Sequence, residues 1–454
     1  MVLWCLDGLV LLVLALYVVA GITRVPFHGD ESTLIHMSRD YHTLVQRRDL
    51  DAVLYAESPD DPSMQELRLL NGTISKMTIG LAWDAAHLTV DDLNDQWIWG
   101  FDDPSGEWDE FTYNTAFGHM PDDHLLHVAR LPSALFAVLS VWAVFGIARL
   151  TTGTRAAAWA ASLMYATTPA VLLNGRRAMM EGSLLAFSTL AAFAALLLIV
   201  HLRSGDRGRR LAALTLAFGV MSGFAVASKH PAVITVAALF LALALDPWMR
   251  SGGTLRGLLA WRHIVRLAAA GGVALLVFLA LNPAWWSDPL GMPDRVLTLR
   301  RQLLDGQVQA VGGYDDPLDR VKGLADEAFF AAPQYYELAY WRDFVGGDIA
   351  DYEASGFAGR GTGTVWGVLL AAAFGAGVIA LARRWREGPA WSVLVWGAGT
   401  ALALVVLTPM QWQRYYLPLQ PPLAVIEGIG VGWIGAALVR GMKRRGVLSG
   451  WNDA

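Results

Sequence analysis

The sequence predicts an all-α polytopic membrane protein with about ten transmembrane helices and two long segments on one side of the membrane. Three observations predict this class. Of the 454 residues, 55% are hydrophobic and 17% are charged, whereas soluble proteins have about 45–50% apolar and about 25% charged residues. Apolar runs of about 20 residues, the length of a membrane span, recur along the chain. Arginine and lysine are concentrated in alternate connections between these runs.

Ten apolar runs are the expected spans. We interpret the first as a retained span rather than a cleaved signal, because it has no basic leader and no small-residue cleavage site before Asp30. Two close pairs, the third with the fourth and the fifth with the sixth, suit tight helical hairpins. The runs cover residues 3–22, 131–150, 156–173, 178–201, 211–228, 231–248, 263–282, 363–382, 391–408 and 415–439.

The chain is therefore expected to divide into six parts. These are residues 1–22 as the first span, 23–130 as a long loop, 131–282 as spans two to seven, 283–362 as a second long loop, 363–440 as spans eight to ten, and 441–454 as a tail. The first long loop is expected to hold interfacial helices, because Leu34, Met37, Tyr41 and Leu44 recur at helical spacing. A small folded insertion resting on the spans is the alternative.

The charges of the connections predict the orientation. If the N-terminus is cytoplasmic, the positively charged stretches 149–155, 201–210, 249–262, 383–389 and 440–454 are cytoplasmic too. Both long loops then lie on the outer face of the plasma (inner) membrane, and both termini lie inside. We expect an active site on the outer face.

Unusual polar residues gather at the outer ends of the spans. Ionisable groups at this depth are costly and usually mark a polar cavity or a substrate path. They are Asp30 and Glu31 after the first span, Arg176, Arg177 and Glu181 between the third and fourth, Lys229 and His230 between the fifth and sixth, Asn282, Trp285 and Asp288 after the seventh, and Arg414 and Tyr415 at the tenth.

These residue types suit displacement at the anomeric carbon of a sugar. A carboxylate, Asp30 or its neighbour Glu31, can take the proton of an acceptor hydroxyl. Cations can stabilise a departing phosphate, and the candidates are Lys229, Arg414, Arg176 and Arg177. Alternatively, Lys229 snorkels to the headgroups and Arg414 is an interfacial arginine. Glu181 is a second acid that, with Asp30, could bind a divalent cation (Mg, Mn or Zn), or that holds an arginine.

Other features narrow the classes of function. The single cysteine, Cys5, excludes a disulfide within the chain and a multi-cysteine metal site. The chain has no Walker A, GxSxG or HExxH motif, and nothing points to nucleic acid. The aromatic stretch Trp97–Phe101 is either a lipid-facing anchor or an acceptor-binding edge.

Several motifs together resemble the GT-C glycosyltransferases of the protein O-mannosyltransferase and aminoarabinose-transferase (ArnT-like) type, glycosyltransferase family 39. The order of the motifs and their common side carry the resemblance. They are Gly29-Asp30-Glu31, Arg130-Leu131-Pro132-Ser133-Ala134, Asn174-Gly175-Arg176-Arg177 with Glu181, Gly223-Phe224 through Ser228-Lys229, and Gln413-Arg414-Tyr415-Tyr416-Leu417-Pro418.

The resemblance implies a GT-C helical bundle and a phospholipid-carrier-dependent, inverting transferase. Asp30 matches the presumed catalytic base, Glu181 a second acidic position, Lys229 the residue that holds the carrier phosphate, and Arg414 the Arg-Tyr pair. The donor would be a polyprenyl-phosphate sugar, with a protein, lipid or glycan as acceptor and membrane lipids around the spans. The long first loop departs from the family pattern.

Two other functions compete with this one. A lipid or solute transporter, or flippase, would place ionisable groups near the midplane, often in repeated halves, and the sequence shows neither. A non-catalytic scaffold would bind a partner through its long acidic loops, but it would leave Lys229 and the paired arginines at the span ends unexplained.

Overall fold

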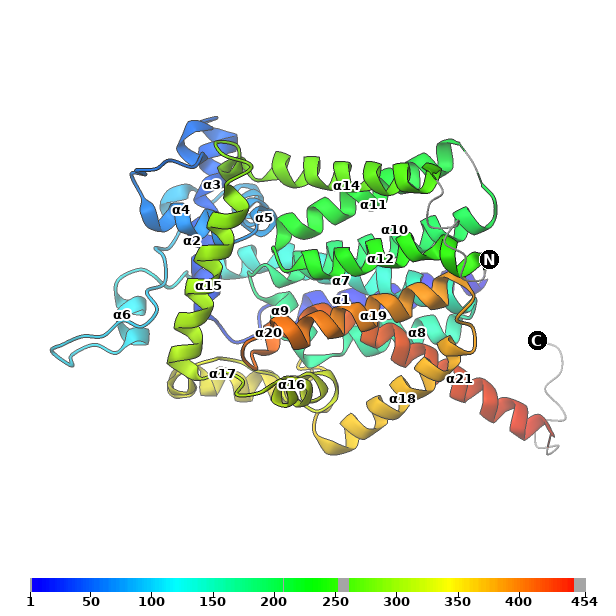
Figure 1. The fold of residues 1–454 in the computed structure, drawn as a ribbon. Helices are drawn as coiled ribbons and strands as arrows, with labels where there is room; N and C mark the ends of the chain where they lie inside the picture. The colour runs from blue at the N-terminus through cyan, green and yellow to red at the C-terminus, as the bar shows by residue number, and fades with distance from the viewer. Residues whose placement is uncertain (1, 207, 252–260, 445–454) are drawn as a thin grey trace.

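The computed structural model describes residues 2–206, 208–251 and 261–444, and these form helices and loops without any strand (Figure 1). Among them, nine helices are long and apolar enough to cross a membrane, and a bent pair of shorter helices is a tenth candidate. The prediction of an all-α polytopic fold with about ten spans is therefore confirmed. Most of the tail predicted at 441–454 lies outside the described residues.

The candidate spans correspond in order to the ten predicted runs. They are α1 (Val2–Ala20), α7 (Asp123–Thr152), the pair α8 (Arg155–Ala166) and α9 (Pro169–Arg176), α10 (Glu181–Arg203), α11 (Arg209–Ser228), α12 (Ala232–Arg250), α14 (Trp261–Leu281), α18 (Thr364–Ala382), α19 (Gly388–Leu407), and α20 (Gln413–Tyr416) continuing through η6 (Leu417–Leu419) into α21 (Gln420–Arg444).

Shorter helices make up the two long segments. The first segment contains α2 (Gly29–Met37), α3 (Arg39–Tyr41), η1 (His42–Gln46), η2 (Asp51–Val53), α4 (Pro62–Leu70), α5 (Thr73–Ala85), η3 (Val90–Asp92) and α6 (Glu110–Ala116). The second contains η4 (Pro283–Trp285), α15 (Met292–Val311), α16 (Pro317–Phe329), η5 (Ala339–Trp341) and α17 (Arg342–Ala354).

The third span is not the straight helix expected at 156–173. It breaks after Ala166, and α8 and α9 meet at an angle of 59°. Pro169 opens α9, and because proline lacks a backbone N–H and clashes with the preceding turn, it starts a helix more readily than it continues one. The break places the end of α9, with Arg176, against the end of α1 and the second long segment.

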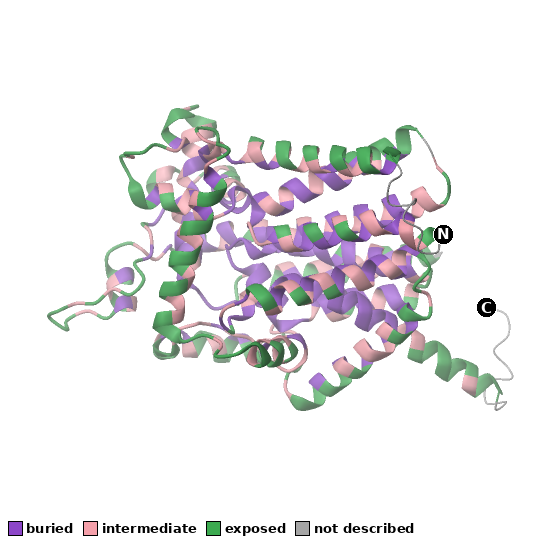
Figure 2. Cartoon of the chain, viewed as in Figure 1, coloured by how far each residue is buried: buried purple, intermediate pink, exposed green. Residues whose placement is uncertain are grey.

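Close packing in the bundle depends on small residues. Gly430 of α21 lies against the backbone of Ala373 in α18, and Gly428 of α21 lies against Ala161 in α8; a Cβ atom at either glycine would collide with these neighbours. Small residues let membrane helices approach closely. Figure 2 shows the result, with buried residues concentrated in the centre of the bundle and exposed residues on its outer helices.

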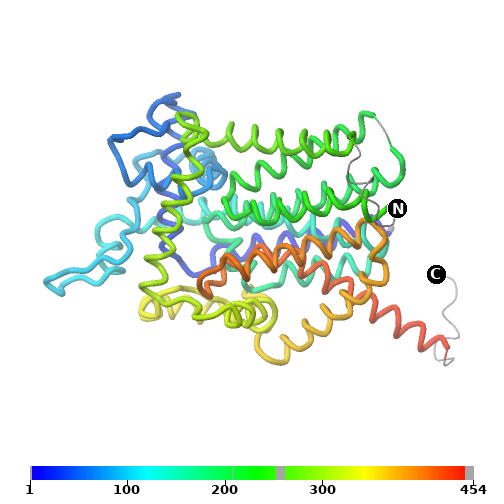
Figure 3. Tube along the Cα trace, viewed as in Figure 1, coloured from blue at the N-terminus to red at the C-terminus, as the bar shows by residue number. Residues whose placement is uncertain are grey.

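The two long segments pack together at one end of the bundle, whereas the start of α1 and the end of α21 lie at the other (Figures 1 and 3). They share a hydrophobic core that includes Leu34, Trp83 and Trp97 from the first segment and Trp341 from the second. The first segment is thus a folded insertion, the alternative to simple interfacial helices. This core fixes the residues that follow α1.

Candidate active site

The first turn of α2 positions Asp30. The Nδ1 atom of His28 accepts a hydrogen bond from the backbone N–H of Asp30 (3.1 Å), and the Glu31 carboxylate accepts one from the backbone N–H of His28 (3.1 Å). This capping arrangement fixes the start of the helix, where carboxylates are also favoured by the helix dipole. The two neighbouring acids therefore diverge: Asp30 is a quarter exposed, and Glu31 is fully buried.

A cavity of about 690 Å³ opens beside Asp30, within the range of small-molecule sites. Five residues predicted from the sequence line it: Asp30, Glu181, Lys229, Arg414 and Tyr415. Other lining residues come from both long segments and include Thr33, Ser63, Glu66, Asn71, Gln96, Trp99, Arg300, Gln307, Glu337 and Trp412. The structure thus joins residues from both ends of the sequence in one cavity, whose walls also include apolar side chains such as Leu67, Met180 and Leu303.

Arg414 is held by two carboxylates. One guanidinium nitrogen pairs with Asp30, and its Nε lies 3.2 Å from Glu337 Oε1. The other oxygen of Glu337 lies 2.7 Å from His28 Nε2. Burial by itself raises the pKa of the Asp30 carboxyl, but the positive charge of Arg414 outweighs it and lowers that pKa below its ordinary value. Asp30 is therefore ionised at neutral pH, as a base must be.

Lys229 and Glu181 form a second buried pair. Glu181 opens α10, Lys229 follows the last residue of α11, and Lys229 Nζ lies 2.5 Å from Glu181 Oε1. The other oxygen of Glu181 is buried without a hydrogen-bond partner. Burial lowers the pKa of Lys229, against the attraction of Glu181. The charge of the lysine is thus largely balanced within the protein.

Arg300 differs from the other two cations of the cavity. Among the described contacts it has no hydrogen bond and no carboxylate partner, and its guanidinium lies 5.7 Å from the ring centre of Tyr415. It belongs to α15, which crosses the end of the bundle (Figure 1). Arg300 therefore offers the cavity a positive charge that no described carboxylate neutralises.

Glu31 does not line the cavity, contrary to its prediction as a catalytic residue. Its two oxygens accept hydrogen bonds from Arg130 at 2.7 and 2.8 Å, and Oε1 also accepts one from the backbone N–H of Ala178 at 2.8 Å. A side chain with no exposed surface cannot reach a substrate. Glu31 instead ties α2 to α7 and to the segment before α10.

Arg176 and Arg177, predicted to bind the donor phosphate, also lie outside the cavity and are fully buried. Arg176 donates to the backbone carbonyls of Tyr17 and Val18, both at 2.8 Å, and to Tyr352. Arg177 donates to the carbonyl of Tyr335 at 2.8 Å. Their donors serve the protein backbone, so these arginines hold α1 and the second long segment to α9.

The remaining candidates lie beside the cavity rather than in it. His230 packs edge-on against Phe278 and Trp285, and burial lowers its pKa to about 4. The Asp288 carboxylate accepts a hydrogen bond from the backbone N–H of Gly291 (3.0 Å). His230, Trp285 and Asp288 therefore shape the turn after α14 and the start of α15.

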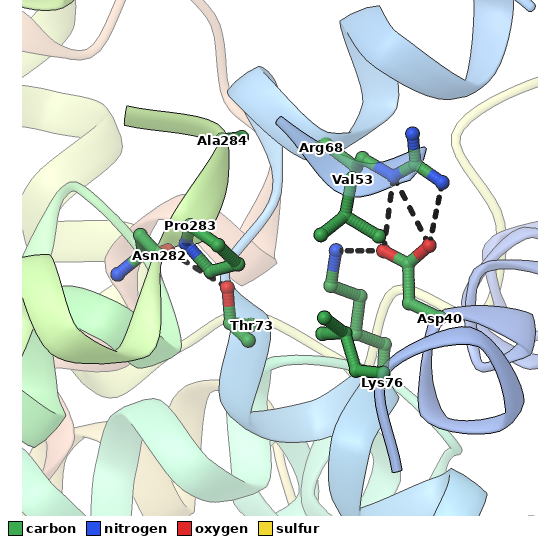
Figure 4. A pocket seen from close by; sticks show the side chains of 9 residues that line it. Asp40, Val53, Arg68, Thr73, Lys76, Asn282, Pro283 and Ala284 are labelled. Atoms are coloured by element: carbon green, nitrogen blue, oxygen red, sulfur yellow. Dashed lines mark hydrogen bonds and ion pairs between the residues drawn. The ribbon is translucent and has the colours of Figure 1, made fainter. Parts of the chain in front are cut away.

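Asn282 lines a different, very small pocket, shown in Figure 4. Its side-chain oxygen accepts a hydrogen bond from Thr73 (2.7 Å). In the same pocket Asp40 pairs with Lys76 at 2.5 Å and with Arg68 at 2.8 Å. These groups satisfy one another in about 10 Å³ of space, which leaves room for a water molecule at most. The pocket is a polar joint between the first long segment and the turn after α14.

A divalent cation does not fit the carboxylates that the sequence proposed for it. Asp30 is paired with Arg414, and Glu181 is paired with Lys229. In the part of the chain that the structure describes, no group of three or more His, Cys, Asp or Glu side chains is placed to hold a metal ion. Each of these two carboxylates already has a cationic partner, so a metal ion would meet negative charge that is largely balanced within the protein.

The sequence did not point to Arg300 and Glu337, which line the cavity, or to His28, which is buried outside it and pairs with Glu337. Arg300 sits in a polar amphipathic helix where an arginine is unremarkable. Glu337 could have been found from the sequence, because it is the one acidic residue in the aromatic run Tyr335–Trp341. An isolated carboxylate among aromatic residues needs a partner.

Comparisons with known proteins agree with this architecture. The family model of dolichyl-phosphate-mannose-protein mannosyltransferases matches residues 72–284. A sequence search of curated proteins gives no match. ArnT from Cupriavidus metallidurans, solved with bound undecaprenyl phosphate, superposes with a TM-score of 0.53 at 14% identity, covering 98% of this chain and 66% of ArnT.

Two structures from Archaeoglobus fulgidus share the fold at 14% identity. The oligosaccharyltransferase in the apo form has a TM-score of 0.52 and covers 96% of this chain and 51% of its own. AglB in complex with an inhibitory peptide and a dolichol-phosphate has a TM-score of 0.50, and the superposition covers 99% of this chain and 52% of AglB. This chain thus spans about half to two thirds of the length of these proteins. Residues 72–284 are thus similar in sequence to the dolichyl-phosphate-mannose-protein mannosyltransferases, and the chain shares its fold with ArnT and the archaeal oligosaccharyltransferase.

Proposed function

We propose that this protein transfers a sugar from a polyprenyl-phosphate-linked donor to an acceptor hydroxyl at the outer face of the membrane, with inversion at the anomeric carbon. The observation that carries the proposal is the joint placement of Asp30, Arg300 and Arg414 in one cavity. A base and cations in one chamber are what displacement of a phosphate requires. The bound undecaprenyl phosphate of ArnT and dolichol-phosphate of AglB support this class of donor.

The donor phosphate is bound on the side of the cavity formed by Arg300, Arg414 and Lys229. Arg300 contributes most, because its charge is free, whereas Lys229 is balanced by Glu181. A guanidinium presents a planar fork that matches phosphate oxygens. The polyprenyl tail extends from there between the spans. These cations hold the leaving phosphate while its charge develops.

The transfer step is a single displacement. The acceptor oxygen attacks the anomeric carbon from the side opposite the carrier, forming the new C–O bond. The bond from that carbon to the carrier oxygen breaks, and the phosphate leaves with the electron pair. The proton of the acceptor hydroxyl passes to Asp30. One bond forms, one breaks, and the anomeric configuration inverts.

Arg414 couples donor binding to the release of the base. Asp30 and Glu337 share its guanidinium. A donor phosphate would compete with Asp30 for the same N–H groups. The Asp30 carboxylate would then be available to an acceptor hydroxyl when the donor is in place, while Glu337 keeps Arg414 oriented.

The positions of the charges support this proposal over the transporter alternative. Asp30 follows α1, Glu181 begins α10, Lys229 follows α11, and Arg414 lies in the first turn of its span. Each is therefore at a span end, whereas transporters usually bind substrate near the midplane.

The test is transfer by the purified full chain in lipid nanodiscs. With polyprenyl-phosphate-linked sugars as donors, we expect protein-dependent release of polyprenyl phosphate. Nuclear magnetic resonance of the product should show the inverted anomer. A retained anomer would overturn the single displacement. In closed proteoliposomes, translocation of the sugar lipid across the bilayer without any bond broken would favour a flippase.

A further inference from the structure

One aromatic ring of the cavity, Trp99, is held in a fixed position by α6. Asn114 brackets the preceding residue: its side chain accepts a hydrogen bond from the backbone N–H of Ile98 (2.8 Å) and donates to the carbonyl of Ile98 (3.1 Å). On the other side, the Glu110 carboxylate accepts from the backbone N–H of Gly100 (2.6 Å). Asn114 and Glu110 are buried. The loop is therefore rigid on both sides of Trp99, without regular secondary structure.

The indole of Trp99 is also supported from behind. It stacks on Trp341, with ring centres 5.3 Å apart and planes at 26°, and Trp341 is 1% exposed. Trp99 itself keeps 38% of its surface exposed and lines the cavity. A buried ring beneath an exposed one makes a flat, preorganised apolar platform. A lipid anchor would need no such support.

The platform lies directly beside the proposed base. A Cβ atom on Gly29 would come within 2.7 Å of the Trp99 ring, so the ring rests on the residue just before Asp30. From Asp30, contacts continue to Arg414, to Tyr415 and to Arg300. Trp99 and the free cation thus lie at opposite ends of a chain of contacts that has the base in between.

Unpaired polar groups line the same cavity. The Thr33 hydroxyl is buried without a partner, and Thr33 lies one helical turn after Asp30. The oxygen of the Gln96 amide accepts from Ser63 (3.0 Å), and its NH2 group makes no described hydrogen bond. Glu66 has no described hydrogen bond or ion pair. A hydroxyl, an amide donor and a carboxylate are therefore available to a ligand.

We propose that Trp99 is the platform on which a sugar ring of the acceptor stacks, so that the acceptor is a carbohydrate, a glycan or the glycan part of a glycolipid. This inference rests on the proposed transferase function. A pyranose has an apolar C–H face that suits an indole and a rim of hydroxyls that need both donors and acceptors. Thr33, Gln96 and Glu66 supply both. With the ring on Trp99, one of its hydroxyls can reach Asp30.

Binding can be measured separately from transfer. We would use the full chain in nanodiscs prepared without sugar detergents, and probe it by saturation-transfer difference nuclear magnetic resonance. The probes are methyl glycosides of common hexoses and pentoses, and a short Ser/Thr peptide. At least one glycoside should give a signal that is strongest on the C–H protons of one ring face. Trp99→Ala should reduce that signal at least tenfold, and Trp99→Phe should retain most of it.

Trp286 provides the matched control. Its indole is 45% exposed and does not line the cavity, so Trp286→Ala should leave the glycoside signal unchanged. Glycoside binding that is the same in Trp99→Ala as in the wild type would overturn the proposal. So would Trp99-dependent binding of the peptide with no glycoside signal, since the acceptor would then be a protein.

Different experimental results would contradict the transferase function and the sugar-binding role of Trp99. Wild-type protein that binds glycosides through Trp99 but never releases polyprenyl phosphate would contradict the transferase and leave the sugar platform standing. With an active transferase, Trp99→Ala should slow transfer to the bound glycoside and leave slow hydrolysis of the donor by water unchanged. Loss of both reactions together would assign Trp99 to the donor instead, and would overturn the acceptor platform.

Discussion

Arg414 pairs with Asp30 across 384 residues of sequence. Asp30 belongs to the first helix after α1, and Arg414 belongs to the short helix that opens the last span. Glu337, from the second long segment, holds the same guanidinium. Three distant parts of the chain thus meet at one arginine. This contact forms only when both long segments are folded against the spans.

Arg300→Gln should weaken donor binding without affecting the fold. The guanidinium has no described carboxylate partner, so its removal leaves no buried charge. A charge-assisted hydrogen bond to phosphate is worth about 1.5–3 kcal/mol, which predicts a KM for the donor raised roughly tenfold to a hundredfold. Arg301→Gln is the control, because the neighbouring Arg301 is exposed and does not line the cavity. Equal effects of the two changes would contradict a phosphate site at Arg300.

Lys229→Met should be more harmful than the double change Lys229→Met/Glu181→Gln. The single change leaves Glu181 buried without its partner at 2.5 Å, which costs about 3–5 kcal/mol. Neutralising Glu181 as well removes that penalty. The double variant should therefore regain most of the thermal stability, measured as the unfolding midpoint, but not the affinity for donor. Additive losses in the double-mutant cycle would show that the pair is not coupled.

Glu31→Gln should destabilise the protein rather than alter its chemistry. The buried carboxylate accepts from Arg130 and from the backbone of Ala178, and breaking such a pair costs about 3–5 kcal/mol. Replacing both Glu31 and Arg130 with methionine should restore part of the unfolding midpoint. Activity per folded molecule should stay within a few-fold of the wild type. A Glu31→Gln variant with a wild-type unfolding midpoint but no sugar transfer would show instead that Glu31 takes part in catalysis.

The ion pair of Glu31 with Arg130 should also make the stability of the protein depend on pH in the acidic range. The Arg130 charge outweighs burial and holds the pKa of the Glu31 carboxyl below its ordinary value of 4.5. The stabilisation that the ionised Glu31 carboxylate gives to the folded state is therefore complete above pH 4.5. It is lost as the pH falls through the lower pKa of the folded state. Glu31→Gln should accordingly lower the unfolding midpoint at pH 7 and have less effect at the most acidic pH that the wild type tolerates.

Glu327 should make stability fall as the pH rises. Burial raises the pKa of its carboxyl to about 7, and the charge of Asp326 adds to the effect, against hydrogen bonds from Gln413 and Gln411. Because the pKa is raised in the folded state, the stabilisation that Glu327 gives in its protonated form is complete below about pH 4.5. It is lost as the pH rises through about 7. Glu327→Gln should therefore raise the free energy of unfolding at pH 8 by at most about 3 kcal/mol, with little change at pH 5. Asp343→Asn, at an exposed carboxylate of α17, is the control and should show no such dependence.

Much of the fold could be predicted because the membrane imposes simple rules. Apolar length located the ten spans, and the alternate positive connections predicted that both long segments share one end. The bend between α8 and α9 was missed, although Pro169 marks it, because apolar composition continues through the break. The sequence also could not predict that the two long segments share one hydrophobic core, because Trp341 of the second segment lies more than 200 residues along the chain from Trp97 of the first.

The candidate site was predicted where a charge stood out from an apolar background. Asp30, Glu181, Lys229 and Arg414 all follow or open a span, and all four line the cavity. The same rule failed for Arg176 and Arg177, because a backbone carbonyl can satisfy a buried arginine as well as a ligand can. It also failed for Arg300, because α15 contains several other charged residues and Arg300 does not stand out among them. Distinguishing Asp30 from Glu31 required the geometry of one helix turn.

The most direct test of the account is the rate of transfer by Asp30→Asn. The change keeps the shape of the side chain and leaves Glu337 on Arg414, so undecaprenyl phosphate should bind within a few-fold of the wild type. Because a general base contributes about 10²–10⁴-fold, single-turnover transfer from a saturating polyprenyl-phosphate sugar should fall by about that factor. Asp95→Asn, at a carboxylate that is 60% exposed, should transfer normally. A wild-type rate in Asp30→Asn would contradict the assignment of Asp30 as the base.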